Sequence, residues 1–154
     1  MVSERRPQAP RELLARYHAE LVSLIPAEER DKYRVRLGAG LVEPFLDSLG
    51  GQALTAEELK PRLEAYLRDE LQMADSAQIM LEGDKLQVEI RGCHLCFGND
   101  RLRAKGQQGF CPYAPGLNRA VSKALQQGTQ LQGVDKSTGV VGECTLQYEI
   151  HGGS

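Results

Sequence analysis

The sequence has no tryptophan and few other aromatic residues, with five tyrosines and three phenylalanines among 154 residues. Proteins that bind single-stranded nucleic acid in a groove stack successive bases on aromatic side chains, so this shortage argues against such a groove. An excess of positive charge is missing as well, because 19 Lys and Arg face 21 Asp and Glu, for a net charge of −2. We therefore expect neither nucleic acid nor an anionic membrane surface as a partner.

Long apolar runs are also missing. A membrane-spanning helix needs about 18 or more consecutive apolar residues, and no stretch approaches that length. The first ten residues, MVSERRPQAP, lack the apolar centre of a signal peptide, and we expect residues 1–10 to be disordered because they are charged and rich in proline. Residues 11–154 suffice for a single domain with one core. The sequence predicts one cytoplasmic domain without a membrane segment.

Apolar residues recur at helical spacing in the first half of the chain. A helix is predicted over residues 11–25, with Leu14, Tyr17, Leu21, Leu24 and Ile25 on its apolar side. Another helix begins at Thr55 as N-cap, with Glu58 as its capping-box partner. Its apolar residues are Leu59, Leu63, Tyr66, Leu67 and Leu71. These patterns predict that helices dominate the N-terminal half.

Between these two helices, residues 28–49 predict a helix whose interior contains Gly38, Gly40 and Pro44. Glycine and proline in a helix indicate either close packing against a neighbour or a break between two shorter helices. Close contact at Gly38 and Gly40 would suit a homodimer built on the first two helices. Packing within one chain explains the same glycines equally well.

After residue 73 the apolar residues alternate with polar ones, which is typical of strands. The predicted elements are a hairpin over 78–90, a helix from Pro115 and Gly116 to about Gly128, and a closing hairpin over 131–150. Cys144 shares its parity in the last strand with three apolar residues, Leu146, Tyr148 and Ile150, so we expect it to face the core. The order of three helices, hairpin, helix and hairpin predicts an α+β fold, with the N-terminal helices packed against a small antiparallel sheet.

The chain has four cysteines, and all of them are candidate metal ligands: Cys93, Cys96, Cys111 and Cys144. Cys93 and Cys96 form a Cys-x2-Cys pair, which can direct both sulfurs at one tetrahedral ion. Cys111 precedes a predicted helix, whose positive end stabilises a thiolate. In a reducing compartment clustered cysteines are more often metal ligands or redox thiols than disulfides. We therefore predict a zinc site made of four thiolates.

Three alternatives remain for these thiols. Four cysteines could hold an iron-sulfur cluster, although their spacing differs from the compact ferredoxin pattern. Cys93 and Cys96 could form a redox-active pair, but such a pair usually begins a helix after a strand, and Gly98 and Asn99 are not typical of a helix here. The cysteines could also pack without a ligand as small apolar groups. His94 is a further candidate ligand, and another is a carboxylate, Glu143.

The surroundings of the cysteines are basic, with Arg91, Arg101, Arg103 and Lys105 against a single acid, Asp100. These cations could offset the charge of several thiolates, or they could simply be solvated. We expect His18 and His151 at the surface. The sequence shows no Ser-His-Asp arrangement, phosphate-binding glycine loop or two-histidine metalloprotease signature, and nothing predicts a catalytic base. This pattern favours a binding protein over an enzyme.

The stretch CPYAPGLNRAVSKALQQGTQLQGVDKSTGVVGECTLQYEI resembles the 4-vinyl reductase-like, or hydrocarbon-binding, domain family. Cys111, Gly116 and Cys144 are the matching positions, and the resemblance covers roughly residues 75–150. It implies a small-molecule sensor or accessory domain, commonly dimeric through helices and in some members zinc-binding. The ligand would be a small hydrophobic or tetrapyrrole-like molecule. Five residues are candidates either for lining its pocket or for an ordinary core: Leu41, Phe45, Leu63, Leu67 and Leu117.

Overall fold

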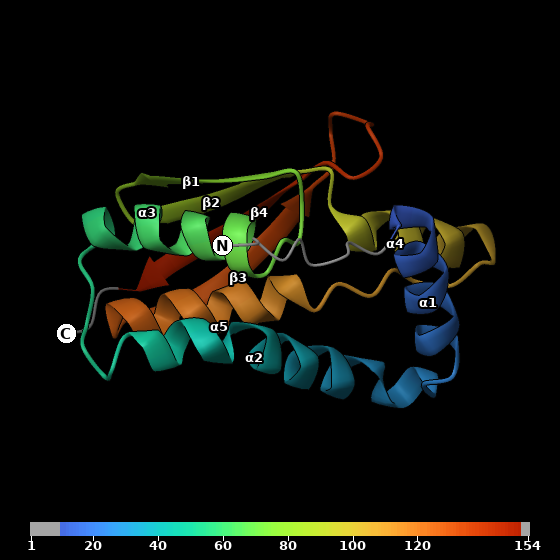
Figure 1. Ribbon diagram of the computed structural model, residues 1–154, viewed down its shortest axis with the longest axis horizontal. Helices are drawn as coiled ribbons and strands as arrows, with labels where there is room; N and C mark the ends of the chain where they lie inside the picture. Colours follow the sequence, from blue (N-terminus) through green and yellow to red (C-terminus); the bar gives the residue numbers. More distant parts are fainter. Residues whose placement is uncertain (1–9, 152–154) are drawn as a thin grey trace, which may run out of the picture.

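A computed structural model describes residues 10–151, which form an α+β fold, as predicted (Figure 1). The elements are α1 (Arg11–Ser23), the 3-10 helix η1 (Ala27–Glu29), α2 (Arg30–Ser48), α3 (Ala56–Ala65), the π-helix η2 (Tyr66–Glu70), β1 (Ser76–Glu82), β2 (Lys85–Arg91), α4 (His94–Ala104), α5 (Tyr113–Leu125), β3 (Gly128–Asp135) and β4 (Cys144–His151). The predicted disorder of residues 1–10 lies outside the described residues except for Pro10, the N-cap of α1.

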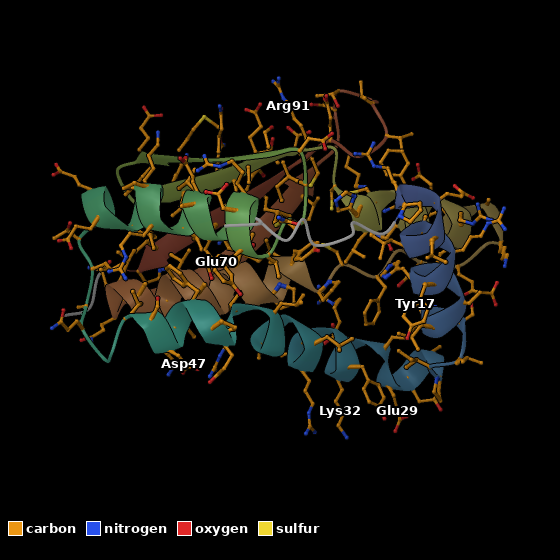
Figure 2. The ribbon with its side chains drawn as sticks, viewed as in Figure 1. Tyr17, Glu29, Lys32, Asp47, Glu70 and Arg91 are labelled. Atoms are coloured by element: carbon orange, nitrogen blue, oxygen red, sulfur yellow. The ribbon has the colours of Figure 1, made fainter. Side chains whose placement is uncertain are left out.

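The four strands form one antiparallel sheet in the order β1-β2-β4-β3. Helix α5 lies between this sheet and α2, while α3 packs against β1 (Figure 1). Alternate residues of β4 are buried, including Cys144, so its predicted orientation toward the core is confirmed. The opposite face of the sheet is polar, and Figure 2 shows Arg91 pointing away from it. The core therefore lies between one sheet face and the helices.

Local capping places α3 as predicted. The backbone N–H of Glu58 donates to Thr55 Oγ1 at 3.2 Å, and the Thr55 hydroxyl lies 3.0 Å from the Glu58 carboxylate. This reciprocal pairing satisfies an N–H group that the first turn of a helix otherwise leaves free. The predicted hairpin over residues 78–90 is also confirmed by β1 and β2. Among the described helices, none is both long and apolar enough to cross a membrane.

Helix α2 is continuous through Gly38, Gly40 and Pro44, so the predicted alternative of a break there is wrong. Gly38 explains the continuity, because α2 packs against the first turn of α5 at this residue. A Cβ atom at Gly38 would lie 2.7 Å from the backbone nitrogen of Gly116. A Cβ atom at Gly40 would have no neighbour within 4 Å. The Gly38 contact is therefore made within the chain, and the homodimer stays a prediction.

Helix α1 buries a different face from the predicted one. Its buried residues are Ala15, His18, Ala19 and Val22, whereas Tyr17, Leu21 and Leu24 are exposed, as Figure 2 shows for Tyr17. The reason is the close approach of α4, where a Cβ atom at Gly98 would lie 2.9 Å from the Ala15 carbonyl oxygen. Only small side chains fit such a contact. The prediction that His18 lies at the surface is wrong, while His151 is exposed as expected.

Residues 94–104 form α4, a helix that was not predicted. The buried face of α4 contains Cys96, Gly98, Asn99 and Leu102, so only one large apolar residue marks it. Helical spacing of apolar residues could not reveal such a helix, because its partner α1 also presents small side chains. Cys93 is the N-cap of α4 and is separated from β2 by one residue, Gly92. The prediction that no helix follows this pair is therefore wrong, and so is the argument against a redox pair that depended on it.

A buried hydrogen-bond network joins α1, α4 and the segment before α5. His18 Nε2 lies 2.8 Å from Asn99 Oδ1, and the same oxygen accepts the backbone N–H of Phe110 at 2.8 Å. Because Asn99 Oδ1 can only accept, His18 donates through Nε2. Burial lowers the pKa of His18 below its ordinary value. The hydrogen bonds with Asn99 and Phe110 raise the pKa and offset part of this shift. Burial therefore favours the neutral imidazole with its proton on Nε2.

We expect acid to weaken the fold through His18. The unfolded chain takes up this proton near pH 6.5, whereas the folded chain resists it, so the stability that His18 contributes is present above that pH and falls below it. His18→Gln removes the titrating group and can still donate to Asn99. The melting temperature should fall between about pH 7.5 and about pH 5.5, and it should fall less for the variant than for the native chain. Equal losses would contradict the assignment.

Candidate functional site

The structure brings the four cysteines together from three parts of the chain. Cys93 and Cys96 lie at the junction of β2 with α4, Cys111 lies just before α5, and Cys144 is the first residue of β4. The Cys96 thiol interacts with both Cys93 and Cys144, and these interactions shift the pKa of Cys96 in the opposite direction to that of its two neighbours. Cys111 interacts electrostatically with the other three thiols. Cys96 is thus the central member of the group.

Backbone contacts hold these thiols in place. The N–H of Cys93 donates to the Gly142 carbonyl at 3.0 Å, so the β3–β4 loop closes over the start of α4. Gly142 has a φ of +90°, and a Cβ atom there would lie 3.4 Å from the Cys93 nitrogen. Glycine suits this position because it adopts a positive φ without strain and has no Cβ atom to crowd the Cys93 nitrogen. On the other side, the Tyr148 hydroxyl donates to the Ala114 carbonyl at 2.7 Å and joins β4 to the first turn of α5.

The thiols differ in their affinity for protons. Hydrogen bonds from Cys144 and Cys93, supported by the charges of Lys136 and Arg103, lower the pKa of Cys96 to about 3. The shared hydrogen bond and burial raise the pKa of Cys93 and of Cys144 well above the ordinary thiol value. Burial also raises the pKa of Cys111. The favoured arrangement is therefore a Cys96 thiolate that accepts from two neutral thiols.

The cations near the thiols are mostly not the predicted ones. Lys136 Nζ lies 4.0 Å from Cys96 Sγ, and the charge of Arg34 acts on Cys111. Sequence reasoning missed both residues, although the β3–β4 hairpin register could have placed Lys136 beside Cys144. Of the four predicted basic residues, Arg103 interacts with Cys96 and also pairs with Asp100 at 3.0 Å. The remaining three form ion pairs with acids: Arg91 with Glu89, Arg101 with Glu12 and Lys105 with Glu20.

A cavity of about 440 Å³ opens beside the thiols, which is within the usual range for small-molecule sites. Its lining combines thiols, charged and polar groups and an apolar wall: Asp31, Arg34, Cys96, Asn99, Arg103, Gln108, Gly109, Cys111, Ala114, Leu131, Val134, Lys136 and Cys144. The five residues considered for a ligand pocket belong to the core instead. Phe45, Leu63, Leu67 and Leu117 are buried there, and Leu41 packs against them.

The two other candidate ligands lie outside this lining. His94 is half-buried at the start of α4, and its Nδ1 atom has no hydrogen-bond partner among the described residues. Glu143 lines a separate cavity of about 190 Å³ on the other side of Cys144. Within residues 10–151, no three His, Cys, Asp or Glu side chains are arranged as a metal ion requires. The thiols are instead linked in pairs through Cys96.

Comparisons with known proteins bear on the fold. No known protein family matches the sequence, and no curated protein is significantly similar to it. A solved structure of a trafficking protein particle complex subunit 3 from Naegleria fowleri, covalently bound to palmitic acid, is similar in three dimensions. The two chains are 12% identical, with a TM-score of 0.51 over 92% of this chain and 95% of that chain. At this level of identity, the likeness shows a shared fold.

Proposed function

We propose that the chain is a regulatory or accessory domain that binds a small molecule beside a zinc ion held by Cys93, Cys96, Cys111 and Cys144. One observation carries the proposal: thiols from the β2–α4 junction, the start of α5 and the start of β4 interact with one another around a single cavity. Three of the four cysteines, Cys96, Cys111 and Cys144, line this cavity although they lie far apart in the sequence. The resemblance to hydrocarbon-binding domains points the same way.

The donor chemistry fits zinc. Thiolates are preferred zinc ligands, and a site of four sulfurs is typical of a structural ion. Bound zinc would replace the thiol protons and supply one charge centre that joins the three parts of the chain. Lys136, Arg103 and Arg34 would offset the negative charge of the four thiolates. Because the thiols are linked in pairs rather than arranged around one point, zinc binding requires their side chains to turn toward a common centre.

The small-molecule part of the proposal rests on the cavity. Its lining combines thiols and cations with three apolar residues, Ala114, Leu131 and Val134. The palmitic acid bound to the Naegleria fowleri subunit is consistent with a hydrophobic ligand in this fold. A homodimer formed through the helices and a cytoplasmic location complete the proposal, and both rest on sequence alone. Sizing chromatography would test the first of them.

A redox role is the second candidate function, and α4 favours it. Cys93 is the N-cap of this helix, separated from the end of β2 by one residue, and Cys96 lies in the first turn. A Cys-x2-Cys pair at such a helix start is typical of thiol oxidoreductases, because the helix dipole stabilises a thiolate. An external two-electron oxidant, such as the disulfide of another protein, would join Cys96 to either Cys93 or Cys144 by a disulfide bond while the oxidant is reduced to two thiols. This candidate requires the thiols to be free of metal.

Elemental analysis of protein purified without oxygen separates these possibilities. We expect about one zinc ion per chain, no iron and no colour, since four thiolates suit one closed zinc site. A thiol titration should then detect few reactive cysteines until a strong chelator releases the ion. Brown protein containing iron would indicate an iron-sulfur cluster. Metal-free protein with titratable thiols would support the redox candidate and contradict the zinc site.

A further inference from the structure

A second cavity of about 430 Å³ adjoins the one beside the thiols. The residues that line both are Asp31, Arg34, Gln108 and Gly109. We call the joined cavities the basic groove, because four cations line it. Arg103 and Lys136 lie near the thiols, Arg34 lies in the middle, and Arg30 lies at the far end. The groove therefore leads from the thiols along the beginning of α2.

The charge of the basic groove is opposite to that of the chain as a whole. The full sequence has a net charge of −2, yet Asp31 is the one carboxylate among the residues that line the groove. Asp31 pairs with Arg34 at 2.7 Å, and the Arg34 side chain is 29% exposed. A concave surface with excess positive charge concentrates anions. A groove lined by four cations and one carboxylate, in a chain of net negative charge, thus has the electrostatics of an anion site.

The thiols do not account for all of this charge. Lys136 and Arg103 interact with Cys96, and Arg34 interacts with Cys111. Arg30, however, lines only the second cavity. It is held there because its Nη2 donates to Gln107 Oε1 at 3.0 Å and its Nε donates to the Ile25 carbonyl at 3.2 Å. Positive charge therefore extends beyond the metal site, on a side chain fixed by hydrogen bonds.

We propose that the basic groove binds a small organic anion, with its carboxylate or phosphate group at Arg30 and Arg34 and its apolar part beside Leu131 and Val134. A guanidinium group can form two parallel hydrogen bonds with either oxyanion, which suits it to this role. The side chains of Gln107 and Gln108 provide further donors on the same wall. This inference rests on the proposed function and names the chemical class of its ligand.

Calorimetric titration of the full chain, as purified, tests the proposal. The probes are octanoate and octyl phosphate, with octanol as the uncharged comparator. We expect the better anion to bind at least about tenfold more tightly than octanol, because it gains charge-assisted hydrogen bonds. The stronger of the two identifies the oxyanion. Equal binding of octanol, or binding of a mixed-sequence RNA oligonucleotide without binding of either anion, would overturn the proposal.

Substitutions in α2 should change the affinity for the anion in opposite directions. Arg34→Gln should weaken binding of the anion about tenfold, and Arg30→Gln should weaken it similarly. Asp31→Asn removes the one lining carboxylate and should strengthen binding about threefold. Arg36→Gln is the matched control, because Arg36 is exposed on the same helix and lines neither cavity. Equal affinities in Arg34→Gln, Arg30→Gln and Arg36→Gln, with unchanged circular dichroism, would refute the assignment.

Metal content, measured on each preparation, separates this inference from the proposed function. Zinc-containing protein that binds no anion would overturn the basic groove as a ligand site and leave the zinc site in place. Metal-free protein that binds the anion through Arg34 would support the groove and remove the zinc site. Arg30→Gln with native zinc content and weaker anion binding is the result that we expect, because Arg30 lines only the second cavity.

Discussion

Replacing Cys96 by serine should abolish metal binding and cost more stability than any other change at the thiols. Cys96 interacts with both Cys93 and Cys144 and lines the cavity with Cys111 and Cys144, so its sulfur is central to the group. A structural zinc ion contributes its binding free energy to folding, and serine is a poor zinc ligand. We expect retained zinc to fall below about one-tenth of the native content and the free energy of unfolding to fall by about 4 kcal/mol or more.

Elemental analysis and urea unfolding would measure these two quantities. Tyr148→Phe is the control, because Tyr148 lies on β4, the strand that begins with Cys144, and its hydroxyl donates to Ala114 rather than to a thiol. That change should cost about 1–2 kcal/mol and leave zinc in place. A strong chelator should destabilise the native chain but not Cys96→Ser. Stoichiometric zinc in Cys96→Ser, at native stability, would contradict a site centred on this sulfur.

Gly38→Ala should have the largest effect of any change outside the thiols. The added methyl group would overlap backbone atoms of Pro112 and Gly116, which cannot turn aside as a flexible side chain can. Helix α5 must then move away from α2, and we expect a loss of about 3 kcal/mol in the free energy of unfolding. Because Pro112 follows Cys111 directly, the same displacement should weaken zinc binding.

Gly40→Ala is the matched comparison for this change. Gly40 lies in the same helix, and a Cβ atom there meets nothing within 4 Å. Alanine favours a helix over glycine, so this variant should gain about 0.5–1 kcal/mol. Urea unfolding of both variants should therefore show changes of opposite sign in the free energy of unfolding. Equal effects would show that helix propensity, rather than the contact between α2 and α5, decides the outcome at Gly38.

Elements with strong local patterns were predictable from the sequence. Thr55 and Glu58 identify the start of α3, because the Thr55 hydroxyl oxygen accepts the backbone N–H of Glu58 and its hydroxyl donates to the Glu58 carboxylate. Alternation in the last strand places Cys144 on the buried face, since side chains in a strand change sides at every residue. The spacing of Cys93 and Cys96 likewise indicates two thiols that lie close together. Each of these inferences depends on residues near one another in the chain.

Helix α4 and the buried face of α1 were not predictable in this way. Their contact is made by small residues, with Ala15 against Gly98, and by the hydrogen bond between His18 and Asn99. Neither feature produces apolar periodicity. Local spacing favoured Tyr17 and Leu21 for the core, although both are exposed. Close approach of two backbones excludes large side chains, and a sequence pattern does not record which helix approaches which.

By itself the sequence determined the α+β class and the positions of most elements. It also identified the four cysteines as candidate ligands of one site. The tertiary structure decided that Cys96 is their centre, that Arg34 and Lys136 accompany them, and that the adjoining cavity is basic rather than lined by the core leucines. Hydrophobic periodicity and capping act within one element, so the chain order reveals them. Electrostatic contacts between side chains distant in sequence exist only after the elements have packed together.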